Sequence, residues 1–386
     1  MPRLTIVTSL LPPEQGGPAQ QTSDLAEYAH EQNVTTRVVL VGRQKRWDSP
    51  QSVPVSRCPL SLLPVPGLNY LWVILYALYH CLRYRPHLIH TQVFGGPSAI
   101  AFVLVGKLLR ISVYSKVSSE RGVDKLMQNK PEVKRRDLLR ASSWDDRLQV
   151  MMCDRLLATT HAFRRILPRK YGIASERVLY FPNFTTLPVQ SPKLGELNQI
   201  AAERRAACGE LLTVARGIRQ KNFGACVQTA VRLRDMGVAF RWHILGGFTP
   251  AYEHEIREQI ESAELTQHVL LCGKQPPAVV REYLSNADIF VMLSQFEWFG
   301  ISVIEAMAAN VAVIVNKVPG MSEIVASPLA RVRAERPEEV AERIAILLTN
   351  PDVYHEQVSL ANQRVARCYQ VEHTGKLLVN WLRSKT

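Results

Sequence analysis

The sequence predicts an α/β protein with two domains, each built on a parallel β-sheet with helices on its faces. Its length of 386 residues is more than one hydrophobic core usually serves, and it favours two domains of about 180 residues each. In both halves, short apolar runs typical of buried strands alternate with longer stretches of helical periodicity. Several of these runs end in a glycine-containing loop that leads into a helix, which is the pattern of βαβ units.

The composition is typical of a globular protein from a reducing compartment. Hydrophobic residues make up 47% of the chain. The 7 cysteines are odd in number and show neither C-x-x-C nor metal-ligand spacing, so we expect buried free thiols, no disulfide and no zinc. The N-terminal MPRLTIVTSLLPP lacks a small-residue cleavage site and predicts a first strand rather than a signal peptide. We therefore expect a cytoplasmic protein.

Two features bear on a membrane surface. The apolar window from Leu68 to Tyr79 is too short for a membrane span and suits a buried or interfacial helix. The net charge is +13, and the region from Phe102 to Tyr171 carries 16 Lys or Arg against 7 Asp or Glu. This excess predicts either a solvated surface with phosphate-binding residues or a basic face for acidic lipids or phosphate-bearing acceptors, peripheral on the inner face of the membrane. No nucleic-acid motif accompanies the charge, so nucleic acid is not an expected partner. The basic residues of this region are most closely spaced at Lys130, Lys134, Arg135, Arg136 and Arg140.

The first unit of the N-terminal half runs from a strand at Leu4 to Leu10 through a glycine pair into a helix. Gly16 and Gly17 have no Cβ, so backbone here can approach a pyrophosphate closely. The run from Thr36 to Gly42 is placed as the next strand of a βαβ unit. We therefore expect Gly16 and Gly17 to contribute to ligand binding.

A second unit places His90 at the end of a strand, before the pair Gly95 and Gly96. A histidine in this position is either a structural core residue or a ligand-binding residue. The strand that follows, in ISVYSKVSSERGVDKL, ends in polar residues, and Asn183 in VLYFPNF closes the half. These strand-end polar residues are Lys116, Ser118, Ser119, Arg121 and Asp124.

After a polar, proline-containing linker, a second Rossmann-like series begins at ELLTVARGIRQKNF. Arg216 and Lys221 follow its first strand within one loop, where a guanidinium and an ammonium group can clamp a diphosphate. The alternative interpretation is two solvated loop charges. The pair Gly246 and Gly247 ends the next strand, and Gly273 ends the one after.

The strongest functional signal lies in SQFEWFGISVIEAMA, residues 294–308. Asp288 to Leu293 predicts a buried strand, and a helix is expected from Ile301 to Ala309. Glu297 then lies in the loop and Glu305 about one turn inside the helix. Such a helix presents free N–H groups and its positive dipole end to an anion, while carboxylates accept hydrogen bonds from hydroxyls. A ligand with phosphates and sugars, a sugar nucleotide, fits both.

This segment resembles the E-x7-E signature of the family-4 retaining glycosyltransferases, including the FG, the EAMA and the VPG-x-x-EIV from Val318 to Val325. The resemblance implies that Glu297 addresses the donor sugar and that Glu305 addresses the nucleotide ribose. It further implies residues that contact the diphosphate and residues that bind the nucleotide base. A glycine pair is expected next to the donor phosphates and the acceptor. The residues concerned are Arg216, Lys221, Gly16, Gly17, Gly273, Lys274, Gly300, Ile301 and Ser302.

The sequence departs from the family pattern at three places. Trp298 replaces a small residue before FG and puts a large ring beside the donor pocket. Asn310 replaces a glycine after the helix, which is a mild change because asparagine tolerates the left-handed conformation. Many members carry an acceptor-side or catalytic histidine near Lys116, and this chain has none there.

The family fold implied is GT-B: two facing Rossmann-like domains with a C-terminal helix that crosses back. We expect an acceptor-binding domain at 1–185, a linker at 186–207, a donor-binding domain at 208–368 and a returning helix at 369–386. The function implied is transfer of a sugar, most simply a hexose, from a nucleotide sugar to a glycan or lipid-linked acceptor with retention, in cell-surface polysaccharide or lipopolysaccharide synthesis.

We expect no metal site and no cofactor other than the donor substrate. No D-x-D motif is placed to hold a metal ion, so Arg216, Lys221 and the helix dipole are expected to meet the diphosphate charge. Two alternatives stay open from the sequence. One is a sugar-nucleotide epimerase of the same fold, which would convert the donor without an acceptor. The other is a catalytically inactive sugar-nucleotide-binding subunit, which Trp298 and the missing histidine suggest.

Overall fold

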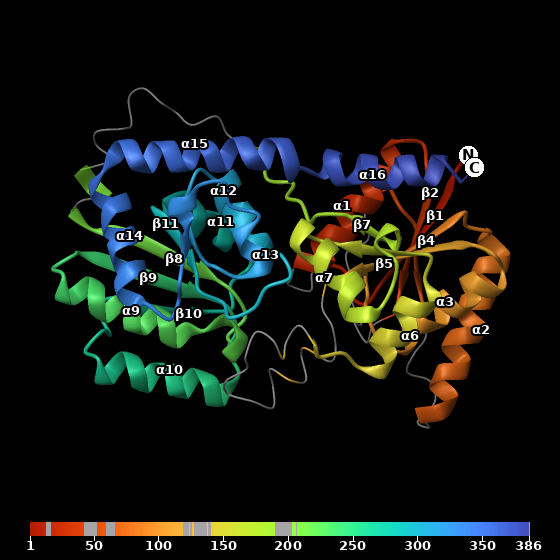
Figure 1. Ribbon diagram of the computed structural model, residues 1–386, viewed down its shortest axis with the longest axis horizontal. Coiled ribbons are helices and arrows are strands. Elements are labelled where there is room, and N and C mark those ends of the chain that lie inside the picture. The colour runs from red at the N-terminus through yellow and green to blue at the C-terminus, as the bar shows by residue number, and fades with distance from the viewer. Residues whose placement is uncertain are drawn as a thin grey trace. The chain divides into compact units, whose positions relative to one another are not determined.

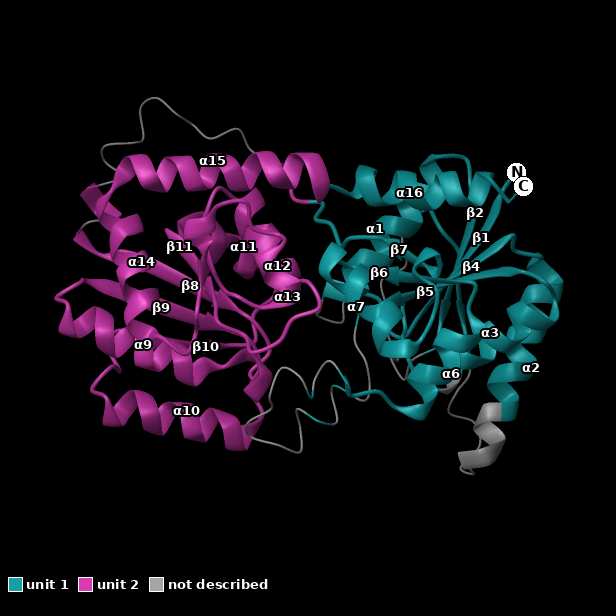
Figure 2. Cartoon of the chain, viewed as in Figure 1, with its two compact units in different colours: residues 1–186, 370–386 teal, residues 187–369 magenta. Residues whose placement is uncertain are grey.

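The chain forms two compact units in the computed structural model (Figures 1 and 2). Unit 1 comprises Met1–Thr186 and Gln370–Thr386, and unit 2 comprises Leu187–Tyr369. Eight residues that the sequence analysis singles out lie outside the described residues: Gly16, Ser119, Arg121, Asp124, Lys130, Lys134, Arg135 and Arg136. The structure describes residues 1–12, 17–41, 52–58, 66–118, 123, 126, 137, 140–189, 203–205 and 207–385.

Unit 1 is built on a parallel sheet of seven strands in the order β3-β2-β1-β4-β5-β6-β7. Helices lie on its faces, as Figure 1 shows. The strands are β1 Arg3–Thr8, β2 Thr35–Leu40, β3 Val55–Arg57, β4 Leu88–Thr91, β5 Ser112–Val117, β6 Arg155–Ala158 and β7 Val178–Tyr180. The helices are α1 Gly17–Glu31, α2 Pro66–Tyr84, α3 Pro97–Leu108, α6 Trp144–Met152, α7 His161–Tyr171, the short η1 Ser175–Arg177 and α16 Val371–Arg383.

Local signals explain where several of these helices begin and end. Ser143 and Asp146 form a capping box at the start of α6, which satisfies two backbone N–H groups that the helix leaves free. Thr160 accepts a hydrogen bond from the backbone of Phe163 at the start of α7. Gly172 ends α7 with φ of 66°, a left-handed conformation that glycine adopts without strain.

Unit 2 repeats this plan with six parallel strands in the order β10-β9-β8-β11-β12-β13. The sequence-based prediction of two Rossmann-like parallel sheets is therefore confirmed. The strands are β8 Gly209–Val214, β9 Phe240–Leu245, β10 Val269–Gly273, β11 Ile289–Met292, β12 Ala312–Asn316 and β13 Arg331–Val332. The helices are η2 Arg219–Lys221, α9 Phe223–Asp235, α10 Pro250–Ser262, α11 Pro277–Asn286, α12 Ile301–Ala308, α13 Pro319–Ser322, η3 Pro328–Ala330, α14 Pro337–Thr349 and α15 Pro351–Cys368.

The sheet of unit 2 is buried on both faces, as its apolar strands predict. One face packs Trp242, Ile244 and neighbours against α9 and α14. The other packs Phe290 and Val303 in a cluster that extends to α15. β11 is fully buried along its length, which fixes the position of the loop that follows it.

The last helix, α16, packs on α1 of unit 1. A Cβ at Gly375 would lie 2.2 Å from the ring of Tyr28, so only glycine permits this close approach. Thr374 donates a hydrogen bond of 3.1 Å to the carbonyl oxygen of Pro182. These contacts join the C-terminal residues to both ends of the N-terminal segment of unit 1.

All 7 cysteines are free. Cys58, Cys81, Cys153 and Cys226 are buried, as the sequence predicts, whereas Cys208, Cys272 and Cys368 are only half-buried. Burial raises the pKa of the thiols of Cys58 and Cys81 to about 12. Within the described part of the chain, no helix combines the length and the hydropathy needed to span a membrane.

Candidate active site

The candidate site lies where the strand order of unit 2 changes direction. β8 pairs with β11 through Leu211 and Leu212, opposite Ile289 and Phe290. From β8 the chain proceeds outward through β9 and β10, and from β11 it proceeds the other way through β12. The two crossovers diverge, so the loops after β8 and β11 meet at the carboxyl edge of the sheet, where open α/β sheets bind ligands.

Hydrogen bonds hold these two loops together. The side-chain amide of Asn222 donates to the carbonyl oxygen of Leu293 at 3.2 Å. The backbone N–H of Gln295 donates to the carbonyl oxygen of Gln220 at 2.9 Å, and the Gln220 amide donates to the Phe296 carbonyl at 2.8 Å. The loop that carries Arg216 and Lys221 is thereby fixed to the loop that carries Glu297.

The segment after β12 fixes the Glu297 loop from its other side. The Asn316 amide donates to the carbonyl oxygen of Ser294 at 2.9 Å, and its own oxygen accepts from the backbone of Ala334 at 3.1 Å. A Cβ at Gly320 would lie 1.8 Å from the carbonyl oxygen of Glu297. The glycine of the VPG sequence is therefore required so that the two backbones can touch.

Helix α12 begins at the site, as predicted. Gly300 precedes it with φ of 98°, and no side chain caps its first turn. Ile301 and Ser302 are the first two residues of the helix, so their N–H groups belong to the unbonded first turn. Glu305 is the fifth residue and is half-buried. The positive end of the helix dipole is therefore available to an anion.

The two charged groups of the first loop lie in different environments. Lys221 forms an ion pair with Glu297, and their side chains are only 12% and 11% exposed. The hydroxyl of Ser294 donates to the same carboxylate at 3.4 Å. Arg216 is exposed and makes no side-chain hydrogen bond or ion pair within the described chain. An incoming phosphate therefore meets one unpaired guanidinium and one ammonium that it must share with Glu297.

The predicted base-binding residues lie beside the same edge. Gly273 adopts φ of 68°, and its carbonyl oxygen accepts from the backbone of Gly246 at 2.8 Å. Lys274 is exposed, and its Cβ is 3.7 Å from where a Cβ at Gly247 would lie. Gly247 in turn accepts a hydrogen bond of 2.9 Å from the backbone of Gly217. The loops after β8, β9 and β10 thus form a continuous backbone surface.

Two of the three departures from the family pattern, Trp298 and Asn310, have structural explanations. Trp298 is 8% exposed and packs edge-on against Phe296, with ring centroids 5.2 Å apart. The ring is therefore part of the support for the loop next to Glu297. Asn310 has φ of 61° directly after α12, which confirms that it occupies a left-handed position. The Asn362 amide donates to its side-chain oxygen at 2.6 Å.

In unit 1, α6 supplies residues that sequence reasoning missed. Gly95 donates its backbone N–H to Gln149 at 2.7 Å, and Gly96 donates to Asp145 at 3.0 Å. This glycine pair therefore binds its own chain. His90 is fully buried, and Gly17 is the first residue of α1. No sequence signal pairs Gly95 with Gln149, because the two are far apart in the chain.

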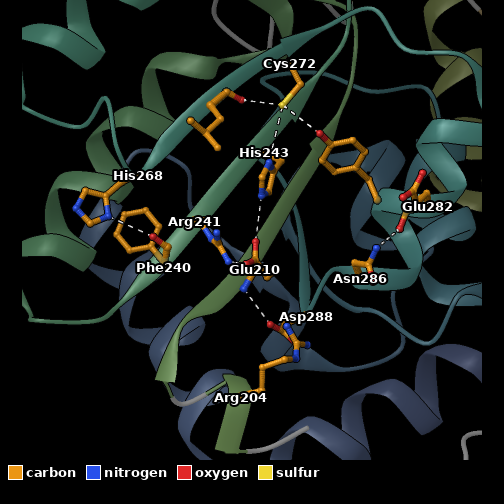
Figure 3. Close-up of polar contacts among 12 residues, drawn as sticks. Arg204, Glu210, Phe240, Arg241, His243, His268, Cys272, Glu282, Asn286 and Asp288 are labelled. Atoms are coloured by element: carbon orange, nitrogen blue, oxygen red, sulfur yellow. Dashed lines mark hydrogen bonds and ion pairs between the residues drawn. The ribbon is translucent and has the colours of Figure 1, made fainter.

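A cavity of about 770 Å³ opens elsewhere in unit 2, at the amino-terminal ends of β8 and β9 and along α11. Several of its charged side chains are paired (Figure 3): Glu210 accepts from Arg241 at 2.6 Å and contacts His243 at 3.0 Å. Arg204 pairs with Asp288. None of the predicted donor-binding residues lines it. Among the described residues, no group of His, Cys, Asp and Glu is placed to hold a metal ion.

Comparison with known proteins finds a family match in each unit. Residues 208–364 match the family "Glycosyl transferases group 1", and residues 16–183 match "Glycosyl transferase 4-like domain". The matched segments make up most of unit 2 and of the N-terminal segment of unit 1.

Curated relatives and solved structures agree with this assignment. The chain is 28% identical over 188 residues to a putative colanic acid biosynthesis glycosyltransferase, WcaL, of Escherichia coli, a match that covers 47% of this chain and 39% of the relative. It is 26% identical over 217 residues to an alpha-galactosylglucosyldiacylglycerol synthase of Streptococcus pneumoniae, covering 55% of each. The chain thus matches about half the length of these relatives.

The similarity of fold extends over the whole chain. The crystal structure of Anabaena Alr3699/HepE in complex with UDP and glucose has a TM-score of 0.74 to this chain at 15% identity, and all of both chains is covered. At that identity the likeness establishes the fold. Residues 16–183 are thus similar to a glycosyl transferase 4-like domain and residues 208–364 to a glycosyl transferases group 1 domain, and the chain as a whole has the GT-B fold.

Proposed function

We propose that the chain is a family-4 retaining glycosyltransferase that moves a sugar, most simply a hexose, from a nucleotide sugar to a glycan or lipid-linked acceptor. The observation that carries the proposal is the convergence of Arg216, Lys221, Glu297 and the first turn of α12 at one sheet edge. A nucleotide sugar contains both a diphosphate, which the two cations can bind, and a sugar, from whose hydroxyls the carboxylate can accept hydrogen bonds.

Each residue has a proposed role. Arg216, Lys221 and the N–H groups of Ile301 and Ser302 bind the diphosphate, and they meet its charge without a metal ion. Glu305 accepts hydrogen bonds from the ribose. Glu297 accepts from the donor sugar, and Gly273 and Lys274 lie beside the base. For Gly16 and Gly17 we propose the role that the family resemblance implies, which is binding of phosphate groups.

The names of two relatives support the proposed acceptor class. WcaL is named for colanic acid biosynthesis and the Streptococcus protein for synthesis of a glycosylated diacylglycerol. One name is that of a glycosyltransferase and the other that of a glycolipid synthase, which favours a transferase over an epimerase or an inactive binding subunit. We propose that this chain acts in the synthesis of a cell-surface polysaccharide or lipopolysaccharide.

Replacement of the two carboxylates should change different kinetic constants. Glu305→Gln is expected to raise the KM for the donor roughly 10- to 100-fold with little change in kcat, because ribose contacts are equal in ground and transition states. Glu297→Gln is expected to lower kcat by a similar factor, since contacts to the reacting sugar strengthen in the transition state. Steady-state kinetics with a UDP-, GDP- or ADP-sugar and an acceptor measure both.

Glu258→Gln serves as a control, because this exposed carboxylate lies in α10, outside the segments of the predicted site, and has no proposed role. Wild-type kinetics for both site variants would contradict the assignment of the loop. Conversion of the donor in the absence of any acceptor would instead favour the epimerase.

The two cations should differ in what their loss does to stability. Arg216→Ala is expected to lower kcat/KM roughly 10- to 100-fold and to leave the free energy of unfolding unchanged, since its guanidinium pairs with no described group. Lys221→Met should also destabilise the fold, on the order of 3 kcal/mol, because it leaves Glu297 buried without a counter-charge. Chemical denaturation and donor kinetics measure the two effects.

The double variant Lys221→Met/Glu297→Gln is the matched control, and it should regain stability without regaining activity. EDTA should leave the wild type active. Strict dependence on Mg²⁺ or Mn²⁺, or full activity of the Arg216 variant, would contradict these roles.

We further propose that unit 1 docks on an anionic membrane surface through α2. Figure 1 shows α2 at the margin of unit 1, and it packs on α3. Val73, Ala77 and Cys81 are buried on its inner side. On its outer side, five apolar residues are 41–59% exposed at helical spacing: Leu71, Trp72, Leu75, Tyr79 and Leu82.

The charge near this stripe suits acidic lipids. Neither α2 nor α3 contains an acidic residue, whereas Arg83 and Arg85 at the end of α2 and Lys107 in α3 are exposed. An amphipathic helix with apolar side chains on one face and nearby cations binds an anionic interface. The cluster from Lys130 to Arg140, most of which lies outside the described residues, adds to the charge.

Replacing the stripe should abolish sedimentation with vesicles. Leu71→Gln/Leu75→Gln is expected to lose most of the pelleting that the wild type shows with vesicles containing acidic lipid at low salt. Salt should also release the wild type, because exposed charges are screened beyond about 8 Å at physiological ionic strength. Met236→Gln/Ile346→Gln, at exposed apolar positions in unit 2, is the control and should pellet as the wild type does. Equal pelleting by all three proteins, or none by the wild type, would rule out this surface.

A further inference from the structure

Unit 1 buries a lysine without a counter-charge at the carboxyl end of a strand. Lys116 is the fifth residue of β5 and is 1% exposed. Its ammonium group forms no hydrogen bond or ion pair within the described chain. Its Nζ lies over the ring of Phe181, 5.3 Å from the ring centroid. Burial lowers the pKa of Lys116 to about 7.

His90 lies on the same face of the sheet. It pairs in register with Tyr114, and Lys116 follows Tyr114 by two positions, so the side chains of His90 and Lys116 point to one side. Both contact Phe181, whose ring centroid is 5.4 Å from that of His90. Burial, and then the charge of Lys116, lower the pKa of His90 to about 3, so this ring stays neutral.

Two buried polar side chains at this edge are poorly paired. The ring of His90 approaches the side chain of Gln92, just after β4, and the backbone of Tyr114. Neither the ring nitrogens of His90 nor the amide nitrogen of Gln92 form a hydrogen bond of good geometry within the described chain. On the other face of the same strands, the polar side chains form hydrogen bonds. The hydroxyl of Thr91 donates to that of Ser115 at 3.0 Å, and the Gln149 amide donates to both hydroxyls at 3.2 Å. Buried polar groups in proteins are normally paired, so unpaired ones gathered at one place indicate a ligand.

Packing alone does not account for Lys116. A cation over one phenylalanine ring gains far less than an ammonium group loses when it leaves water. A methionine or leucine would fill the same volume without that penalty. The position also matters, because β4 lies at the change in strand order between β1 and β4, where an α/β sheet binds ligands.

We propose that Lys116, His90 and Gln92 bind the sugar acceptor, and that this acceptor carries a negatively charged group. The ammonium of Lys116 pairs with that anion. The neutral ring of His90 and the amide of Gln92 exchange hydrogen bonds with neighbouring hydroxyls, which they suit better than a second charge. The inference rests on the proposed transferase function and adds the chemical class of its acceptor, a phosphate- or carboxylate-bearing glycan.

Calorimetric titration of the full chain tests the site, with the donor site first saturated by a nucleoside diphosphate. The probes are glucose 1-phosphate, glucuronate and methyl glucoside, which separate a phosphate from a carboxylate and both from a neutral sugar. The wild type should bind one of the two anionic sugars at least tenfold more tightly than methyl glucoside. Lys116→Met should lose at least tenfold of that affinity. Lys107→Met, at an exposed lysine of α3, should lose none.

Proton uptake separates a ligand-binding lysine from a structural one. At pH 8 the Lys116 amine is mostly neutral, so pairing with an anion must draw a proton from the buffer. Titrations in buffers of different ionisation enthalpy should show this uptake in the wild type and not in Lys116→Met. Equal anion affinity in both proteins, no preference for anionic sugars or no binding by the wild type would overturn the proposal.

Stability provides an independent check on the variants. The pKa of Lys116 in the folded chain lies below its ordinary value of 10.5, so the unfolded chain binds the extra proton between about pH 7 and pH 10.5. Wild-type stability should therefore rise with pH across this window, and that rise should vanish in Lys116→Met or, if methionine folds poorly, in Lys116→Gln. The same rise in the variant would contradict burial of the amine. All variants should bind the nucleoside diphosphate as tightly as the wild type does. If no protein bound it, the proposed donor site would be wrong, and the acceptor site would not be affected by that result.

Discussion

The parallel pairing of β8 with β11 is the constraint on which the candidate site depends. These strands are neighbours in space, and they lie 78 positions apart at the hydrogen bond between Thr213 and Val291. Their crossovers run to opposite sides of the sheet, so the two loops that follow them must share one edge. Glycine at 320 lets a third segment touch the backbone of Glu297. The site is thus shaped largely by backbone contacts, and its side chains project from a rigid base.

Electrostatics divides the site into a paired and an unpaired half. The ion pair between Lys221 and Glu297 is largely buried, and such a pair contributes little net stability because both groups lose hydration. Its value lies in fixing the direction of two side chains that the chemistry needs. Arg216 is held only by its backbone and can move to a ligand. A donor with a diphosphate therefore meets one prepared cation and one adaptable cation.

Local patterns were sufficient to predict the strand, loop and helix around Glu297, because adjacent residues determine them. The expected strand from Asp288 to Leu293 is observed at Ile289–Met292, and the helix begins at Ile301 as predicted. The pairing of Lys221 with Glu297, the support from Asn316 and the capping of Gly95 by Gln149 were not predicted. Each joins residues distant in the chain, and periodicity carries no information about such contacts. The exposure of Leu71 and Leu75 was likewise not predicted, because an apolar helix has the same sequence pattern whether it is buried or interfacial.

A crystal structure with the nucleoside diphosphate that binds best among UDP, GDP and ADP tests the central claim most directly. The account predicts diphosphate oxygens within about 3 Å of the Arg216 guanidinium, the Lys221 ammonium and the backbone N–H groups of Ile301 and Ser302. It also predicts the ribose hydroxyls next to Glu305. A nucleotide bound instead in the cavity beside Glu210 and His243, or on unit 1, would contradict it.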